Sequence, residues 1–521
     1  MGSAQAVLRL HEILCFIRAY PDDAAVLAQV ESMLDAFEHR RDLRAHRKAL
    51  ADTGIAGTPI YYRFFAGQAQ WLAQKWPQHM RLDRSDADAQ ERIARALPPL
   101  LTRAEATALA ELKLRGYDAL DQLCAEGETD AVFLLRRMAA LPVDGFLREW
   151  FSDTVEARFL VAPGPDIPSR TKARFEPAPV ALRRQAITRA RPDLRVELAR
   201  APRSVRRLPP RAGAQMLDLA CGAMVTRARS LEAFSFGDAR DAWLVDDGDG
   251  LAFAFAGVIP QRRHAIASYY GSLTLRNGVP IGYAQVDVVG ASAALSFNAF
   301  ETFRAGEAGF VFARWVAALR HLFGVSSFSI EPYQLGTDND EAIESGAWWF
   351  YAKFGFMPRD GATLKLAQAE FVRARRSAGH RTTPANLRRL AQRHVFFDLD
   401  AGNPRPLMSQ AAMGMQSGKA LSKRSGSDRE RGVDEASAEL MRSCGLQTPR
   451  GLSAAEREAW RRFAPISALL DVPAWQPGQR RALVEVIRAK AGRSERDFIA
   501  SYNAHPRLDA ALVQCLRLLG T

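Results

Sequence analysis

The sequence predicts an α+β protein, with a mixed sheet in the middle of the chain and helical regions on both sides of it. From Val7 to about Trp150, apolar residues recur at the three- and four-residue spacings of amphipathic helices. Between Ala242 and Phe303 the apolar period shortens to that of a strand. A helix, a strand and another helix are then expected after Gly309. This order of patterns is typical of an α+β fold.

The N-terminal domain, residues 1–160, is expected to be all helical. Breaks fall at Pro21, at residues 53–59 and at Pro98. Thr102 followed by Glu105 has the pattern of a capping box, so a helix should begin there. No residues in this region have catalytic spacing.

Residues 161–212 form a basic connector rich in proline and arginine. Between Arg170 and Arg211 there are twelve arginines and one lysine against three acidic residues. We favour a solvated linker here. The alternative is an arm that binds nucleic acid or another polyanion, with an affinity that falls steeply with salt.

The central domain, residues 213–370, should contain the sheet. Asp-Gly pairs at 246–249 and Asn277-Gly278 are hairpin signals between runs with the strand period. A helix is expected from Gly309 to Phe323, and a strand over 326–332. Helical pattern returns over 339–354, with a break at Ser345-Gly346.

Residues 371–434 are predicted to be a connector, and residues 435–521 a small helical C-terminal module. The connector begins as basic helix, with Pro384 in a first turn. Its second half, Asn403 to Gly432, is poor in aromatics and rich in Gly, Ser and charge. That composition predicts a disordered linker.

Whole-chain composition narrows the class of protein. The 521 residues are 48% hydrophobic and 25% charged, as in soluble globular proteins, and no apolar run is long enough for a membrane span. Charges interrupt the apolar N-terminus, so a signal peptide is not expected. Five dispersed cysteines and isolated histidines predict free thiols, a cytoplasmic location and no metal site. The oligomeric state is not predicted.

The segment Phe300–Phe310 carries the clearest chemical signal. A strand-like run ends in small residues and leads directly into a helix, which exposes backbone N–H groups to an anionic ligand such as a pyrophosphate. Further along, Phe350–Phe356 reads FYAKFGF. These two segments define the candidate site.

Both segments resemble motifs of the GNAT superfamily of N-acyltransferases, and the resemblance covers Gln215 to Leu366. In that family a Gln or Arg, two residues, a Gly, one residue and a Gly or Ala hold the pyrophosphate of coenzyme A. Arg304 and Gly309 match the ends of this motif, but Glu307 replaces its central glycine. A register shifted by one residue restores Gly306 and Ala308 but places Phe303 first. The implied cofactor-binding residues are Arg304, Ala305, Gly306, Ala308, Gly309 and Phe310.

The second motif supplies the implied catalytic residues. Tyr351, Lys353, Gly355 and Phe356 match the family's Y-x-K-x-G-F pattern, in which the Tyr protonates the departing thiolate. The amine acceptor also needs a base, for which Glu301 and Glu331 are candidates, with Glu301 slightly favoured because it is closer to the glycine turn.

The resemblance implies transfer of an acyl group from acetyl-CoA or another acyl-CoA to an amine-bearing substrate, by direct attack. The alternative is a GNAT-like scaffold that has lost CoA chemistry and acts as a binding or assembly module. Glu307 and a longer loop before Tyr351 motivate that alternative. A carboxylate at the phosphate site would repel its ligand.

Overall fold

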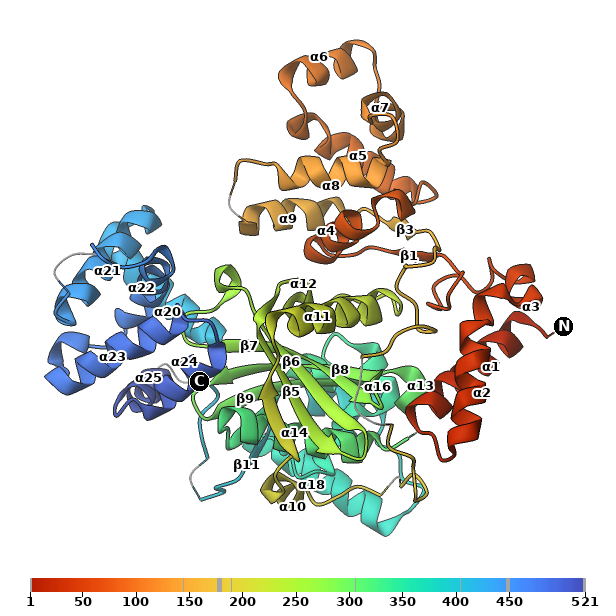
Figure 1. Ribbon diagram of the computed structural model, residues 1–521. Coiled ribbons are helices and arrows are strands. Elements are labelled where there is room, and N and C mark those ends of the chain that lie inside the picture. The colour runs from red at the N-terminus through yellow and green to blue at the C-terminus, as the bar shows by residue number, and fades with distance from the viewer. Residues whose placement is uncertain are drawn as a thin grey trace. The chain divides into compact units, whose positions relative to one another are not determined.

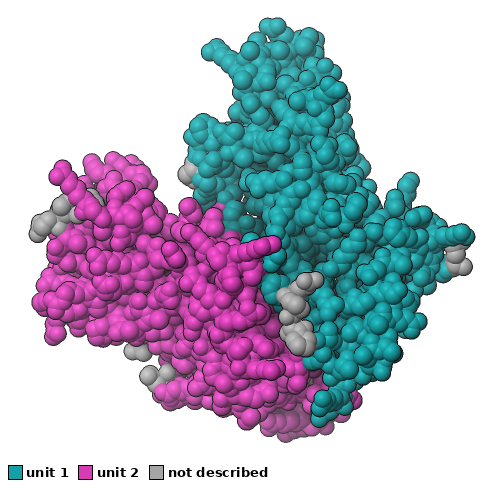
Figure 2. Space-filling model, in the orientation of Figure 1, with its two compact units in different colours: residues 1–185, 214–236, 275–280 teal, residues 186–213, 237–274, 281–521 magenta. Residues whose placement is uncertain are grey.

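The computed structural model describes residues 2–143, 145–175, 180–188, 190–304, 306–402, 404–446 and 450–518. The protein is a mixed α/β molecule with a large mixed sheet and many helices (Figure 1). The chain divides into two compact units, which Figure 2 colours separately. Unit 1 comprises 1–185, 214–236 and 275–280, and unit 2 comprises 186–213, 237–274 and 281–521.

Unit 1 is mostly helical and also contains a small antiparallel sheet. The N-terminal helices are α1 (Ala4–Ala19), α2 (Ala24–Asp35), α3 (Arg41–Ala45), α4 (Ala66–Lys75), α5 (Ala87–Ala96), α6 (Arg103–Glu111), α7 (Gly116–Leu123), α8 (Asp130–Ala139) and α9 (Gly145–Val155). The strands β1 (Ile60–Tyr62), β2 (Met80–Leu82) and β3 (Phe159–Val161) pair in the order β1-β3-β2. The all-helical expectation was therefore wrong, because three-residue strands are too short to show a period of two.

Local signals placed several element ends correctly. Thr102 caps α6, and Glu105 completes the capping box.

The chain after the N-terminal domain forms α10 (Leu194–Ala199), β4 (Ser204–Arg207), α11 (Pro210–Val225) and α12 (Glu232–Ser235). The connector thus contributes an edge strand to the large sheet, and the solvated linker is corrected to structured chain.

The large sheet has eight strands in the order β11-β10-β9-β8-β7-β6-β5-β4. Its remaining strands are β5 (Gly237–Gly248), β6 (Leu251–Val258), β7 (Ser268–Arg276), β8 (Val279–Val289), β9 (Ser292–Ala299), β10 (Ser327–Ile330) and β11 (Val395–Asp398). Strands β8 and β9 pair antiparallel, whereas β9 and β10 pair parallel. The hairpin signals are confirmed: Asn277 and Gly278 have φ of 49° and 77°, as the tight turn between β7 and β8 requires.

A helical crossover joins the parallel strands β9 and β10. It consists of α13 (Glu301–Arg304) and α14 (Ala308–Phe323), and α14 ends at the left-handed Gly324 as the sequence predicts. Phe312 of α14 packs against Phe297 of β9, with ring centroids 5.4 Å apart. Phe323 packs against Tyr270 of β7 at 4.7 Å. This aromatic packing fixes α14 against one face of the sheet.

Between β10 and β11 the chain is helical. The elements are α15 (Pro332–Leu335), α16 (Asp340–Ser345), α17 (Ala347–Ala352), α18 (Gly361–Arg376) and α19 (Pro384–Ala391). Gly346 adopts a left-handed conformation between α16 and α17, at the predicted break, and Pro384 is the first residue of α19. Met357 makes an isolated antiparallel bridge to Phe396 and so extends the sheet beyond β11.

The segment expected to be a disordered linker is mostly helical from Gln410 on; residues 404–409 precede the first helix, and Asn403 lies outside the described residues. Helices α20 (Gln410–Ser425) and α21 (Arg429–Ser443) cover most of it. They are followed by α22 (Ala454–Ser467), α23 (Pro477–Lys490), α24 (Glu495–Ala504) and α25 (Leu508–Leu518). Met413 and Leu421 are buried, as are Leu440 and Met441. Few but well-spaced apolar residues order these helices despite their polar composition.

Candidate functional site

The parallel pairing of β9 and β10 stops at their carboxyl ends. It ends at Leu295 opposite Ile330, where β10 itself ends, and β9 continues to Ala299 with β8 as its paired neighbour. The chain leaving each strand turns at once into a helix, α13 after β9 and α15 after β10. The carboxyl ends of parallel strands are where open α/β sheets bind ligands. The predicted segment Phe300–Phe310 therefore lies at the edge of the sheet where such proteins bind ligands.

The N-terminus of α14 lies in the crossover that follows β9. The first-turn N–H groups of a helix have no intrahelical acceptors, and no side chain caps them here. Ala308, Gly309 and Phe310 form this turn, as predicted for an anion cradle. By contrast, the Gly306 N–H donates to the Phe303 carbonyl at 3.1 Å, so that amide is already engaged.

The remaining predicted cofactor residues contribute less. Arg304 donates to the Ala299 carbonyl at 3.1 Å and to Glu341 Oε1 at 2.9 Å, so its side chain stabilises the crossover. Ala305 lies outside the described residues. Glu307 is the N-cap residue of α14 and only 8% exposed. Its carboxylate suits the helix dipole but opposes a pyrophosphate at the same place.

Tyr351 lies at the end of α17 and is 4% exposed. Burial raises the pKa of its hydroxyl, while a hydrogen bond from the Phe297 backbone N–H partly opposes this. The phenol is therefore protonated at neutral pH, as a general acid must be. Phe297 belongs to the part of β9 beyond its pairing with β10. The hydroxyl thus lies at the part of β9 that extends beyond the end of β10.

Aromatic rings surround Tyr351 at this point. Its ring centroid lies 5.6 Å from that of Phe312, 5.2 Å from Phe350 and 6.1 Å from Phe356. The match to the Y-x-K-x-G-F pattern is thus partly a packing pattern, in which Tyr and Phe anchor α17 to α14. Gly355, at φ 93°, supplies the left-handed turn that follows.

The two candidate bases are both exposed. Glu301 begins α13, and Glu331 is the N-cap residue of α15. Among the described contacts, none joins either carboxylate to Tyr351. The structure therefore places Glu301 and Glu331 at the ends of β9 and β10 but does not assemble a direct acid–base pair.

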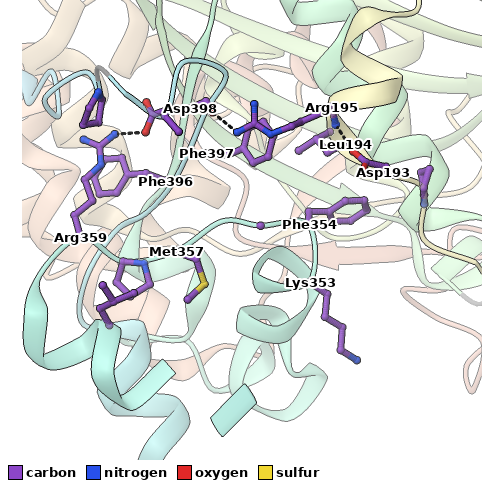
Figure 3. Close-up of a pocket in the computed structure, with 16 residues that line it drawn as sticks. Asp193, Leu194, Arg195, Lys353, Phe354, Met357, Arg359, Phe396, Phe397 and Asp398 are labelled. Carbon is purple, nitrogen blue, oxygen red and sulfur yellow. Dashed lines mark hydrogen bonds and ion pairs between the residues drawn. The ribbon is translucent and has the colours of Figure 1, made fainter. Parts of the chain in front are cut away.

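A pocket of about 790 Å³ lies beyond α17 and involves residues that the sequence reasoning did not single out (Figure 3). We call it the α10–β11 pocket. Its lining residues come from three segments: Pro192, Asp193, Leu194 and Arg195; Lys353, Phe354, Gly355, Met357, Pro358, Arg359 and Leu364; and Phe396, Phe397, Asp398, Ala401 and Pro404. Segments so far apart in sequence carry no shared local pattern. Lys353 and Gly355 alone belong to a predicted motif.

Asp398 organises the polar side of the pocket. Arg359 donates to its Oδ2 at 2.6 Å, and the Ser327 hydroxyl donates to its Oδ1 at 2.7 Å. Arg195 donates to the main-chain carbonyls of Asp398 and Leu399, each at 2.9 Å (Figure 3). The Asp398 carboxylate is therefore satisfied by neighbours, whereas within the described part of the chain the Arg195 guanidinium donates to carbonyl oxygens and no ion pair to a carboxylate is formed.

Several arginines of the arginine-rich segment form ion pairs within the protein. In unit 1, Arg174 pairs with Glu31 at 2.9 Å and Arg183 with Asp22 at 2.8 Å. In unit 2, Arg200 pairs with Glu197 at 3.0 Å. Arg174 and Arg183 thus hold the connector to α2 and to Asp22 just before it, while Arg200 pairs within the connector. Nucleic-acid binding through this segment stays an untested expectation.

Within the described ranges, no three His, Cys, Asp or Glu side chains come together as a metal site would require. The described helices are all too short or too polar to cross a membrane. All five cysteines are free, as expected.

No protein-family model, curated protein or solved structure matches the chain.

Proposed function

We propose that the chain is a GNAT-like N-acyltransferase that transfers an acyl group from acetyl-CoA or a longer acyl-CoA to an amine. The observation that carries the proposal is that β10 ends before β9 does, with the Tyr351 hydroxyl bonded to Phe297 in the part of β9 that extends beyond β10. The strand order supports it, because an antiparallel run leads into this parallel pair. A helix N-terminus suited to a phosphate follows β9.

The proposed reaction is a direct displacement at the thioester carbonyl. A neutral amine nitrogen attacks the carbonyl carbon, forming the C–N bond, and the C–S bond then breaks. Tyr351 gives its proton to the departing thiolate, and the amine loses its proton through water to Glu301 or Glu331. The products are an amide and free CoA, and the proton taken up by the carboxylate returns to Tyr351 through solvent.

Calorimetric titration of the full chain with acetyl-CoA, and with octanoyl-CoA as a longer acyl-CoA, tests the proposal at its first step. Heat that saturates with one molecule of acyl-CoA per chain supports it. Replacing Gly309 with Asp should abolish that heat, since a second carboxylate in the first turn of α14 repels a pyrophosphate. The matched variant Gly361→Asp at the start of α18 should bind as the wild type does. No heat with either thioester would overturn the proposal.

The second candidate is a GNAT-like scaffold that binds or assembles without CoA chemistry. The burial of Glu307 at 8% exposure favours it, because the carboxylate occupies the start of α14. The aromatic cluster around Tyr351 also fills space at the strand ends. The variant Glu307→Gln separates the two candidates. If the wild type gives no heat with acetyl-CoA and Glu307→Gln does, the carboxylate has closed the site.

A further inference from the structure

We propose that the α10–β11 pocket binds a small organic anion with an apolar, preferably aromatic, body. This proposal does not depend on acyl transfer. The volume of about 790 Å³ is in the range of small-molecule sites, and most of the lining residues are apolar. The apolar walls include Leu194, Phe354, Met357, Leu364 and Phe396. Such walls recognise the body of the ligand.

The charge of the ligand follows from the cations at the pocket. Arg195 makes no bond to a carboxylate among the described residues, since its terminal nitrogens donate to the carbonyls of Asp398 and Leu399. Its Nε stays available, and the Phe397 ring lies 5.0 Å from its Cζ. An anion at this guanidinium would gain a charge-assisted hydrogen bond.

A second cation stands behind the pocket wall. The Arg191 guanidinium lies 4.8 Å from the ring centroid of Phe354, and its Nε is buried without a hydrogen-bond acceptor in the described structure. Desolvation lowers the pKa of Arg191, which shows that its positive charge is poorly compensated. This charge adds to the positive potential of the pocket.

The acidic residues of the pocket offset only part of this charge, since Asp193 and Asp398 are outnumbered by three lining cations, Arg195, Lys353 and Arg359. Asp398 is engaged by Arg359 and Ser327 through both carboxylate oxygens. Asp193 accepts the Arg195 and Val196 N–H groups at the start of α10. The Lys353 side chain points away from Phe396 and Phe397, so it is not assigned a role (Figure 3). The pocket therefore repels an ammonium ion and attracts a carboxylate, sulfonate or phosphate.

The aromatic preference follows from the arrangement of the rings. The Arg359 Cζ lies 3.8 Å from the Phe396 centroid, and Arg195 stacks on Phe397. These contacts hold the two phenyl groups in fixed orientations on β11. A flat ligand can then pack against preoriented rings with little loss of side-chain freedom.

The test uses two probes of the same shape and different charge, 1-naphthylacetate and 1-naphthylacetamide, titrated into the full chain by calorimetry. We expect the carboxylate to bind about tenfold more tightly than the neutral amide, as one charge-assisted hydrogen bond provides. Arg195→Gln should remove most of that preference. The control Arg203→Gln removes an exposed arginine outside the pocket and should retain it.

A second variant tests whether the probes bind in the α10–β11 pocket, and it removes no hydrogen bond. Ala401→Trp adds bulk at an exposed lining position, so the fold should tolerate it. Both probes should then bind at least about tenfold more weakly. Equal binding of the carboxylate and the amide to the wild type would overturn the proposal. So would an absence of binding, or wild-type binding by Ala401→Trp.

Discussion

Lys490 donates a hydrogen bond to Glu495 Oε2 over 2.7 Å, although both side chains are almost completely removed from solvent. The same Nζ donates to the Ala267 carbonyl at the start of β7. Burial lowers the pKa of Lys490 to about 8 and raises that of Glu495. The ion pair thus joins α23 to α24, and the bond from Lys490 to Ala267 joins these helices to the sheet.

Neighbouring groups extend this buried cluster. Asp241 of β5 accepts from the Tyr270 hydroxyl at 2.8 Å, from the Ser494 hydroxyl at 2.7 Å and from the Glu495 N–H at 2.8 Å. Arg263 donates to the carbonyls of Lys490 and Gly492. The C-terminal helices are therefore part of the same unit as the sheet, not an independent module.

Replacing Lys490 with Met should destabilise the protein by about 3–5 kcal/mol, because Glu495 would stay buried without its hydrogen-bonded cation and with only the more distant Arg263, at 3.6 Å, to compensate its charge. The midpoint of urea unfolding measures this loss. The double variant Lys490→Met/Glu495→Leu should regain a large part of it, since the orphaned charge is removed as well. Lys365→Met, on the exposed surface of α18, is the control and should change stability by less than about 0.5 kcal/mol. Equal effects at Lys490 and Lys365 would contradict the structural role.

The Glu370 carboxylate contributes to the acid stability of unit 2. It is fully buried, and burial alone would raise its pKa. Hydrogen bonds from Thr382, His380, Arg373 and Asn386 outweigh burial and lower the pKa to about 2. Because the folded pKa lies below the ordinary value of 4.5, its stabilisation is complete above pH 4.5 and is lost as pH falls toward 2.

The variant Glu370→Gln should therefore cost on the order of 3 kcal/mol at neutral pH. The difference from the wild type should shrink as pH falls from 4.5 toward 2, as measured by urea unfolding at a series of pH values. Glu344→Gln, at an exposed position in α16, should give a small difference at every pH. A gap between wild type and Glu370→Gln that stays constant with pH would refute the assigned cause.

The variant Tyr351→Phe tests whether the Tyr351 hydroxyl acts in catalysis or only stabilises the fold. If Tyr351 is the acid, the rate of thiol release from acetyl-CoA should fall by about a hundredfold or more while acetyl-CoA affinity is unchanged. The variant also loses the partner of the Phe297 N–H, which should cost about 1–3 kcal/mol of stability. Tyr333→Phe, at a position 54% exposed, is the control for both measurements. Lost stability with unchanged turnover would leave Tyr351 a purely structural residue.

Short-range signals in the sequence predicted the elements that depend on them. Asn277-Gly278, Thr102 with Glu105, and Pro384 each impose a local backbone conformation, and each is found where expected. Strands β4 and β11, which the sequence analysis missed, are the two edge strands of the large sheet. Such strands exist through pairing with distant partners, which local periodicity does not encode.

The candidate site also has a local part that the sequence predicted and a part that depends on distant residues. The strand-to-helix turn before α14 is local, so its position was predictable from Phe300–Phe310. The α10–β11 pocket was not, because Arg195, Phe354 and Phe397 meet only through the fold. Burial of Glu307 also depends on tertiary packing, and the sequence alone left both consequences of that carboxylate open.

Gly336 shows most sharply how backbone conformation restricts the loop after β10. It ends α15 at φ 127°, a conformation that L residues rarely adopt, and an added Cβ would lie 2.2 Å from Ile343 Cδ1. Gly336→Ala should therefore cost about 2–4 kcal/mol from backbone strain together with steric overlap. Thermal or urea unfolding of the full chain measures it.

Two further variants separate strain from overlap. Gly361→Ala is the matched control, because its Cβ would meet no atom within 4 Å and it begins helix α18 at an ordinary φ. That change should stabilise the protein by about 0.5–1 kcal/mol. The double variant Gly336→Ala/Ile343→Ala removes the overlapping atoms but keeps the strained φ. The second substitution should therefore cost less in the Gly336→Ala background than in the wild type, and simple additivity would show that the Ile343 contact contributes nothing.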